Sequence, residues 1–214
     1  MRGLLVALAG LAAIAVCGPA TAAGEEVAGP AGYPAGSIVI VNSERRLYYI
    51  LGGGRALRYP VAVGKLTELW TGRSFVSMKQ VDPRWIPIDG GDEVEGGDPA
   101  NPLGKRALYL DWSLLRIHGT PSRKSVGSAV SSGCIRMLSE DVIELYDRVH
   151  LGAPVFAIAT PKDTGQFADA KIGSRVYANP EARREAKQAE QDAEDRRERQ
   201  ATQGRRAERR TAAR

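Results

Sequence analysis

Short apolar runs separated by turn residues fill the first third of the chain. Residues 38–41, 47–51 and 57–63 are rich in β-branched, aromatic and other apolar side chains. Polar residues 42–44 separate the first two runs, and the glycines at 52–54 separate the second from the third. Such runs joined by tight turns are typical of strands that pair with their sequence neighbours. The pattern therefore predicts an antiparallel meander of three strands.

The later part of the chain carries less regular apolar runs. Four further strands are expected, at residues 75–81, 108–110, 114–117 and 155–159. Between the second and third of these lies a tight connection, and the third leads directly to a histidine and a glycine. These short segments extend the meander and make β-structure the main component of the fold.

One segment has the period of an α-helix instead. We expect this helix to be capped by Ser139 and to stop at Gly152. Its apolar positions fall on one face and are Val142, Leu145, Tyr146 and Val149. The predicted fold class is therefore mainly β (α+β), with one substantial helix.

Residues 82–105 separate two of the predicted strands without any regular pattern. The segment contains four prolines and five glycines, which exclude long regular elements. A structureless loop of this length in a compact domain is usually functional or mobile. We therefore expect it to border the site.

The first 22 residues have the pattern of a signal peptide. Arg2 precedes an apolar stretch, and Ala20-Thr21-Ala22 is a small-x-small cleavage sequence. The apolar stretch is too short for a comfortable bilayer span, so no stable membrane span is expected after cleavage. Lipidation at Cys17 is the alternative, but the bulky Val16 is unfavourable just before a lipidated cysteine. The sequence therefore predicts an exported protein.

The remaining boundaries follow from composition. Residues 23–36 are rich in Gly, Ala and Pro and are interpreted as a flexible lead-in. The compact domain is placed at residues 37–160, followed by a linker at 161–180. Residues 181–214 form a charged, low-complexity tail, either disordered or a lone solvated helix. An electrostatic tether to an anionic wall polymer is the functional alternative for this tail.

The net charge of +5 does not indicate a nucleic-acid-binding protein. Residues 181–214 hold 11 Lys/Arg and 8 Asp/Glu, and residues 3–180 carry a net charge of only +1. A phosphate-binding surface needs Lys and Arg clustered on the folded domain. The length of 214 residues and the 43% hydrophobic content fit one globular domain with appendages. No nucleic acid is therefore expected as a partner.

Export leaves a single cysteine. Because Cys17 is removed with the signal peptide, Cys134 is the only thiol of the mature chain and has no intramolecular disulfide partner. A lone cysteine is commonly a small buried hydrophobe, but a thiol in an oxidising compartment can also be a nucleophile. The neighbouring residues decide between these two interpretations.

Those neighbours favour a nucleophile. Ser131, Ser132 and Gly133 precede Cys134 and allow a tight, accessible turn, in which the amides of Gly133 and Cys134 can face an oxyanion. An imidazole near a thiol lowers its pKa and can return the proton to a leaving amine, and His118 at a predicted strand end is the candidate. The other histidine, His150, lies at the predicted helix end, where a structural role suffices.

These motifs resemble one known family, the L,D-transpeptidase catalytic domain, also called the YkuD domain, of bacterial cell-wall enzymes. His-Gly-Thr at 118–120 and Ser-x-Gly-Cys-Ile-Arg at 131–136 occur in the family's order, 16 positions apart from His118 to Cys134. Residues 101–110, Trp85-Ile86-Pro87 and Trp70-Thr71-Gly72 are also similar to family segments. The resemblance covers about residues 37–160.

The resemblance implies a β-sandwich or barrel-like domain that acts on peptidoglycan stem peptides. In such enzymes the thiol attacks the third stem residue and expels the terminal D-alanine. An amine from a neighbouring stem or from a wall-anchored protein then takes the acyl group. Cys134 would be the nucleophile and His118 the general base and acid. Gly119 would orient His118 through its backbone carbonyl, and the protein would act in the periplasm or the cell wall.

The resemblance implies less for the neighbouring positions. Arg136 matches the family's arginine two places after the cysteine, where it could fix the loop or bind a substrate carboxylate. Ser131 is the candidate for a supporting hydrogen bond and is grouped with Arg136 as substrate-binding. Ser132 occupies a place where many relatives have histidine, so the proton transfer falls on His118. Tyr109 and Trp112 fit either the core or the wall of a cleft.

Three rival functions stay open on the sequence alone. A hydrolase, of the L,D-carboxypeptidase type, would use the same dyad with water as the acceptor. A papain-like protease is disfavoured because His118 precedes Cys134 in the chain, opposite to that family's order. A non-catalytic wall-binding module would need no activated thiol. No metal or other cofactor is expected, since neither a ligand cluster nor a nucleotide motif is present in the sequence.

Overall fold

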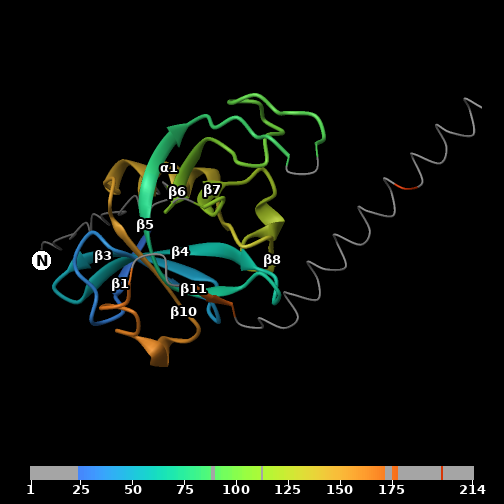
Figure 1. Ribbon diagram of the computed structural model, residues 1–214. Helices are drawn as coiled ribbons and strands as arrows, with labels where there is room; N and C mark the ends of the chain where they lie inside the picture. Colours follow the sequence, from blue (N-terminus) through green and yellow to red (C-terminus); the bar gives the residue numbers. More distant parts are fainter. Residues whose placement is uncertain (1–23, 88–89, 112, 172–174, 178–198, 200–214) are drawn as a thin grey trace, which may run out of the picture.

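The computed structural model describes residues 24–87, 90–111, 113–171, 175–177 and 199 (Figure 1). The predicted signal peptide and nearly all of the predicted tail lie outside the described residues. We therefore describe the domain that lies between them.

Eight strands form a closed, barrel-like ring. Around the ring the order is β4-β3-β2-β10-β5-β6-β7-β9, and β9 pairs again with β4. The ring strands are β2 (Ile38–Val41), β3 (Arg46–Gly52), β4 (Arg55–Gly64), β5 (Trp70–Val81), β6 (Arg106–Leu110), β7 (Arg116–Gly119), β9 (Ile135–Met137) and β10 (Pro154–Ile158). The elements outside the ring are β1 (Glu25–Ala28), β8 (Ala129–Ser131), β11 (Arg175–Tyr177), the helix α1 (Ser139–Arg148) and two 3₁₀ turns, η1 (Arg123–Ser125) and η2 (Pro161–Asp163). The predicted mainly β, barrel-like fold with one substantial helix is confirmed.

The predicted meander is present as β2, β3 and β4, which pair antiparallel in sequence order. Two long strands then join the halves of the ring. β4 pairs with β3 up to Pro60 and with β9 from Val61, while β5 pairs with β10 up to Phe75 and with β6 from Val76. Because each long strand serves two neighbours, the sheet closes without a separate second sheet.

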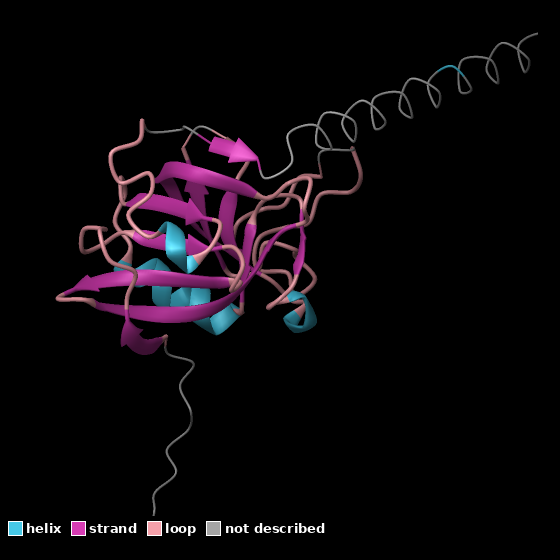
Figure 2. Ribbon diagram, turned by 90° about the horizontal axis from the view of Figure 1, so that it is seen from below, coloured by secondary structure: helices cyan, strands magenta, loops and turns pink. Residues whose placement is uncertain are grey.

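The core lies inside this ring and under α1. Alternating residues of β2, β3, β4, β6 and β7 point inward and join one cluster of buried apolar side chains. The helix packs against β6 and β7 and contributes Val142 and Leu145, both fully buried. Figure 2 shows the helix lying against one side of the strands. This packing fixes β7, the strand that carries His118.

The predicted flexible lead-in is wrong for residues 25–28, which form the edge strand β1. Here Glu25 lies opposite Arg58 of β4 and forms an ion pair of 2.6 Å, while Glu26 pairs with Arg55 at 3.0 Å. The segment lacks the alternation of apolar and polar residues that marks a strand, because backbone pairing with β4 forms it and only Val27 packs partly against the core. The predicted linker likewise contains η2 and the short strand β11, which pairs with β5.

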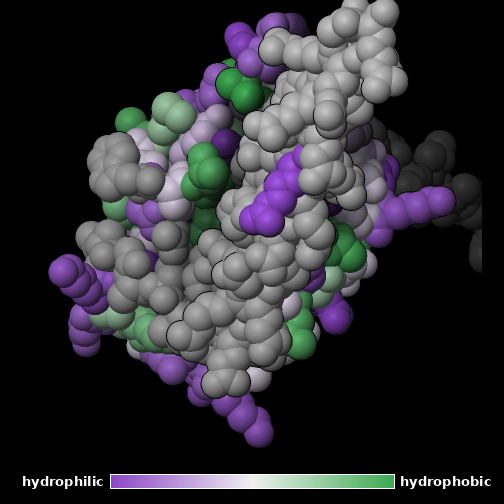
Figure 3. Space-filling model, turned by 45° about the vertical axis from the view of Figure 1, so that its right-hand side comes forward, coloured by the Kyte–Doolittle hydropathy of each residue, from purple (hydrophilic) through white to green (hydrophobic). Residues whose placement is uncertain are grey.

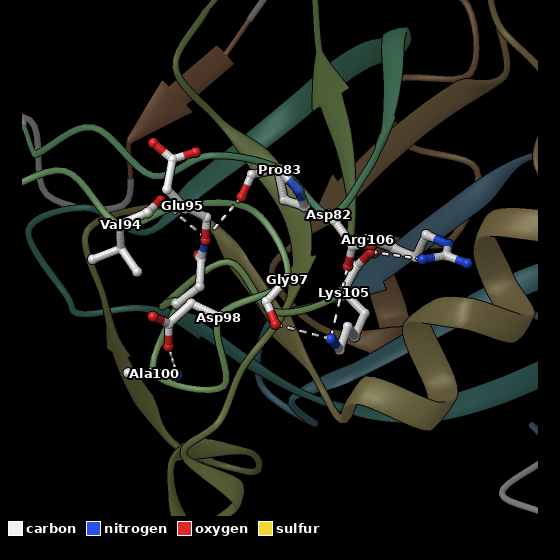
Figure 4. A network of polar contacts seen from close by, with 10 residues as sticks. Asp82, Pro83, Val94, Glu95, Gly97, Asp98, Ala100, Lys105 and Arg106 are labelled. Atoms are coloured by element: carbon white, nitrogen blue, oxygen red, sulfur yellow. Dashed lines mark hydrogen bonds and ion pairs between the residues drawn. The ribbon is translucent and has the colours of Figure 1, made fainter.

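The long loop at 82–105 contains little regular structure, as predicted, yet a buried amide organises it. The side-chain nitrogen of Asn101 donates to the carbonyl oxygens of Pro83, Val94 and Glu95, and Asn101 is fully buried. Figure 4 shows this network together with the Lys105 ammonium, which donates to the Gly97 carbonyl. In a loop with little backbone pairing, hydrogen bonds to this one side chain thus satisfy several backbone carbonyl groups.

On the surface, Figure 3 shows hydrophilic side chains projecting around the outline and hydrophobic ones in separate small patches, among the residues that are coloured. Of the helices in the described part of the chain, none has the length and apolar character needed to cross a bilayer.

Helix α1 begins at Ser139, one residue earlier than predicted, and Leu138 occupies the N-cap without a side-chain hydrogen bond.

The first turn of α1 carries an unusual carboxylate. Asp141 is 5% exposed, and its Oδ2 atom is buried without a hydrogen-bond partner. Burial, with Glu140 and Glu144 nearby, raises the pKa of Asp141 to about 6. At neutral pH a poorly solvated negative charge therefore sits in the helix.

We expect Asp141→Asn to stabilise the protein at pH 8. Because the pKa of Asp141 is higher in the folded state, its stabilising contribution is complete below about pH 3.8 and is lost as the pH rises through about 6. Removing the charge should gain about 1–2 kcal/mol at pH 8 and almost nothing at pH 4, measured as unfolding free energy in urea. Glu140→Gln is the control, since Glu140 pairs with Arg123 at 2.6 Å. A gain at pH 4 as large as at pH 8 would contradict the assignment.

Candidate active site

Two adjacent parallel strands bring the sequence motifs together. β7 and β9 are in register so that His118 lies beside Arg136. Ile117 and Ile135 point into the core, so His118 and Arg136 lie on the opposite face of the strands. Cys134 lies just before β9, after a bend at Ser132 and Gly133, and its sulfur is 3.7 Å from the carbonyl oxygen of Leu114, which lies just before β7. Because His118 lies on β7 and Cys134 directly precedes β9, the pairing of these two strands brings the two sequence motifs together.

His118 is held as a neutral base. It is 4% exposed, and its Nδ1 atom lies 2.6 Å from the carbonyl oxygen of Gly119. A carbonyl only accepts, so Nδ1 carries the proton and Nε2 keeps a free electron pair. The pKa of His118 is lowered to about 4. Burial is the main cause and the charges of Arg136 and Arg116 add to it, whereas the hydrogen bond with Gly119 raises the pKa. The imidazole is therefore ready to accept a proton at neutral pH.

The thiol of Cys134 is also neutral. The side chain is half-buried, and its Sγ–H donates to the Leu114 carbonyl oxygen at 3.7 Å. Burial raises the pKa of Cys134, while the backbone N–H of Arg116, which donates to the sulfur, lowers it. The expectation of a thiol pKa lowered by His118 is therefore wrong for this state: among the described residues the sulfur's proton acceptor is Leu114, and none of its hydrogen bonds is to the imidazole. The thiol proton must change acceptor before attack.

The turn before Cys134 needs glycine. Gly133 has φ +104°, and a Cβ there would lie 3.0 Å from a methyl group of Leu115. Its carbonyl oxygen accepts a hydrogen bond of 3.1 Å from the indole N–H of Trp70, which is 2% exposed. The sequence did not assign this role to Trp70, because β5 and the turn are 63 residues apart.

Ser131 shapes this turn from within. Its hydroxyl donates to the Cys134 carbonyl at 2.5 Å and accepts from the Gly133 N–H at 3.2 Å. Two predictions are therefore wrong. The Gly133 amide is occupied and is not free to bind an oxyanion, and Ser131, at 1% exposed, is too deeply buried to bind substrate. The Cys134 amide stays the candidate oxyanion donor.

We expect Ser131→Ala to slow acylation of Cys134 about tenfold in single-turnover kinetics. The change leaves the Gly133 N–H and the Cys134 carbonyl without their partner, which costs about 1–3 kcal/mol and loosens the nucleophile. The neighbouring, exposed Ser132 is the control, and Ser132→Ala should react within twofold of the wild type. Equal rates for both variants would show that the hydroxyl does not hold the turn.

The structure also gives the positions of the other residues that the sequence singled out. Gly119 is buried, and a Cβ there would meet Val142 of α1 at 3.2 Å, so this position packs strand against helix as well as orienting the imidazole. Arg136 is half-buried beside His118, and His150 lies exposed beyond the end of α1. Among the described residues, no three His, Cys, Asp or Glu side chains converge as metal ligands.

Sequence reasoning missed Arg116. It precedes His118 by two positions, so it lies on the same face of β7 and next to the sulfur. The sequence could have indicated Arg116, because residues two positions apart on a strand lie on the same face and His118 was already a candidate. The opposing β6 residue, Tyr109, shares that face too and pairs directly with Arg116.

The chain is similar to known proteins over the part that holds these residues. The family model of the L,D-transpeptidase catalytic domain, YkuD, matches residues 36–156. The probable L,D-transpeptidase YbiS of Escherichia coli is 34% identical over 140 residues, which are 58% of this chain and 45% of YbiS. YqjB of Bacillus subtilis, whose name also places it among the L,D-transpeptidases, is 36% identical over 129 residues, which are 57% of this chain and 71% of YqjB.

A solved structure has the same fold. The Ldtfm–avibactam carbamoyl enzyme superposes with a TM-score of 0.50 at 21% identity, covering 59% of this chain and 50% of that one. The chain thus spans about half the length of some of the proteins it matches.

Proposed function

Because this chain belongs to the L,D-transpeptidase catalytic domain family, we propose that it is a peptidoglycan L,D-transpeptidase that acts outside the cytoplasm. The observation that supports the proposal is the parallel pairing of β7 with β9, which brings the His118 and Cys134 segments together, with a free electron pair on the imidazole. A thiol and a neutral base in this relation suit acyl transfer.

In the first half-reaction the Cys134 sulfur attacks the carbonyl carbon of the third stem residue. His118 Nε2 takes the thiol proton and passes it to the nitrogen of the leaving D-alanine as the amide C–N bond breaks. The products are a thioester on Cys134 and free D-alanine. The Cys134 amide would stabilise the oxyanion of the intermediate.

In the second half-reaction an amine attacks the thioester. His118 takes a proton from the attacking amine and returns one to the departing sulfur, so a new amide forms and the thiol is restored. The acceptor would be the amine of a neighbouring stem, giving a crosslink, or that of a wall-anchored protein.

The surroundings of the sulfur support access for a peptide. Leu66, Leu114 and Val130 are large apolar side chains that are more than half exposed. Leu114 supplies the carbonyl that binds the thiol, and Val130 and Leu66 flank the backbone bond between Ser131 and Lys65. Apolar groups exposed around a reactive group are a common feature of ligand sites.

For the location, we propose that residues 1–22 are a signal peptide and that the mature chain begins at Ala23, in the periplasm or cell wall. Intact-mass measurement of the protein recovered from outside the cytoplasm tests this proposal. A mass that includes residues 1–22, or a lipid on Cys17, would overturn the cleavage.

Product analysis separates transferase from hydrolase. The protein is incubated with a purified tetrapeptide stem, with and without added D-amino acid or stem amine, and the products are identified by mass spectrometry. We expect D-alanine release and an amine-linked product, with little third-position acid. Third-position acid as the main product at saturating amine would make the protein an L,D-carboxypeptidase, and absence of any turnover would support a wall-binding module.

A further inference from the structure

Arg116 is a cation held in a fixed place beside the thiol. On β7 it lies directly opposite Tyr109 of β6, and its guanidinium carbon is 5.0 Å from the centroid of the Tyr109 ring. The Tyr109 hydroxyl donates to the Gln80 side chain at 2.9 Å, which fixes the ring. A guanidinium stacked on an anchored ring loses little further freedom when it acts on a neighbour.

This cation lacks a carboxylate partner within the described part of the chain. The ion pairs formed by those residues involve neither Arg116 nor Arg136. The Nε atom of Arg116 is buried and has no hydrogen-bond partner. Because no carboxylate of the described residues pairs with this half-buried guanidinium, an anion that forms nearby is stabilised by it.

The anion within reach is the sulfur of Cys134. The backbone N–H of Arg116 donates to that sulfur, and the sulfur is 3.7 Å from the carbonyl oxygen of Leu114, two residues earlier in the chain. The titratable and charged groups on the surrounding elements are His118 and Arg116 on β7, Arg136 on β9, Tyr109 on β6, and Lys65 and Glu68 after β4. Arg116 and Arg136 both lower the pKa of Cys134, and the same two residues lower the pKa of His118.

We propose that Arg116 is a positioning residue for the nucleophile: its guanidinium, stacked on Tyr109, stabilises the Cys134 thiolate as the thiol proton leaves. In this step the S–H bond breaks, the proton goes to His118 Nε2, and the electron pair stays on sulfur. Arg136, which pairs with His118 across β7 and β9, adds to the effect of burial in keeping the imidazole neutral beforehand. The inference adds a residue to the proposed function and rests on Cys134 being its nucleophile.

Alkylation of the thiol tests the proposal without peptidoglycan. The rate of iodoacetamide addition to Cys134 is followed by intact mass between pH 6 and 10 for wild type, Arg116→Gln and Arg116→Lys. We expect Arg116→Gln to move the midpoint of the profile up by about one pH unit, so the rate at pH 7.5 falls about tenfold. Arg116→Lys keeps the charge and should stay within threefold of wild type.

Arg106 offers a matched control. Its guanidinium lies 5.4 Å from the Tyr146 ring and its Nε is likewise buried without a partner, but it is not among the charges acting on Cys134. Arg106→Gln should therefore keep the wild-type profile. The proposal is overturned if Arg116→Gln leaves the profile unchanged, if Arg106→Gln moves it equally, or if Arg116→Lys falls as far as Arg116→Gln. Since iodoacetamide needs no stem peptide, these outcomes are independent of the proposed substrate.

Discussion

Cys134→Ala is expected to abolish acyl transfer while leaving the fold intact. Without the sulfur no thioester can form, so D-alanine release from a tetrapeptide stem should fall by roughly 10⁴-fold or more. The side chain is half-buried, and the hydrogen bond that its Sγ–H donates to the Leu114 carbonyl is long. We therefore expect the unfolding free energy to change by about 1 kcal/mol or less.

Chromatography of released D-alanine and thermal unfolding measure both parts of this prediction. Cys134→Ser is the companion variant, because it keeps the shape of the turn and replaces the sulfur with a much weaker nucleophile. Activity above 1% of wild type in Cys134→Ala would remove the cysteine mechanism. A large loss of stability would instead assign the residue to the core.

His118→Ala should slow acylation by about 10²–10⁴-fold at pH 7, the range typical of a lost general base. The buried imidazole is the group that can take the thiol proton, because the resting thiol is neutral. The wild-type rate should fall only as the pH approaches about 4, where Nε2 becomes protonated. Activity should therefore persist at pH 5.5–6, well below the usual range for histidine-dependent enzymes.

The second histidine provides the control for this variant. His150 is exposed beyond the end of α1, so His150→Ala should retain the wild-type rate within twofold. Single-turnover acylation measured across pH 4–9 distinguishes the two residues. Equal effects of the two substitutions, or an acid limb near pH 6.5, would contradict the role given to His118.

Much of the fold could be predicted because its strands bury strongly apolar runs. β2, β3 and β4 combine such runs with clear turn residues, and α1 has a regular apolar face. β8 and β9 were missed because each is three residues long and is stabilised by its neighbours rather than by its own pattern. Closure of the ring through β4 and β9 depends on those short strands and has no local signal.

Some features of the candidate site could likewise be predicted from the sequence, and others could not. His118 and Cys134 could be proposed from residue type and order, and the parallel pairing of β7 with β9 brings their two segments together. The roles of Ser131 and Trp70 could not be predicted, because they depend on which buried backbone groups lack other partners. The neutral state of the thiol is also a property of burial, which the sequence around a cysteine does not reveal.

The central claim is that Cys134 forms an acyl thioester with a peptidoglycan stem. Intact-mass spectrometry of the mature protein, mixed with a purified tetrapeptide stem and quenched in acid, tests it directly. We predict a mass increase equal to the stem minus D-alanine, located on the peptide that contains Cys134 and absent from Cys134→Ala. An unmodified mass while D-alanine is released, or an adduct on another residue, would contradict the account.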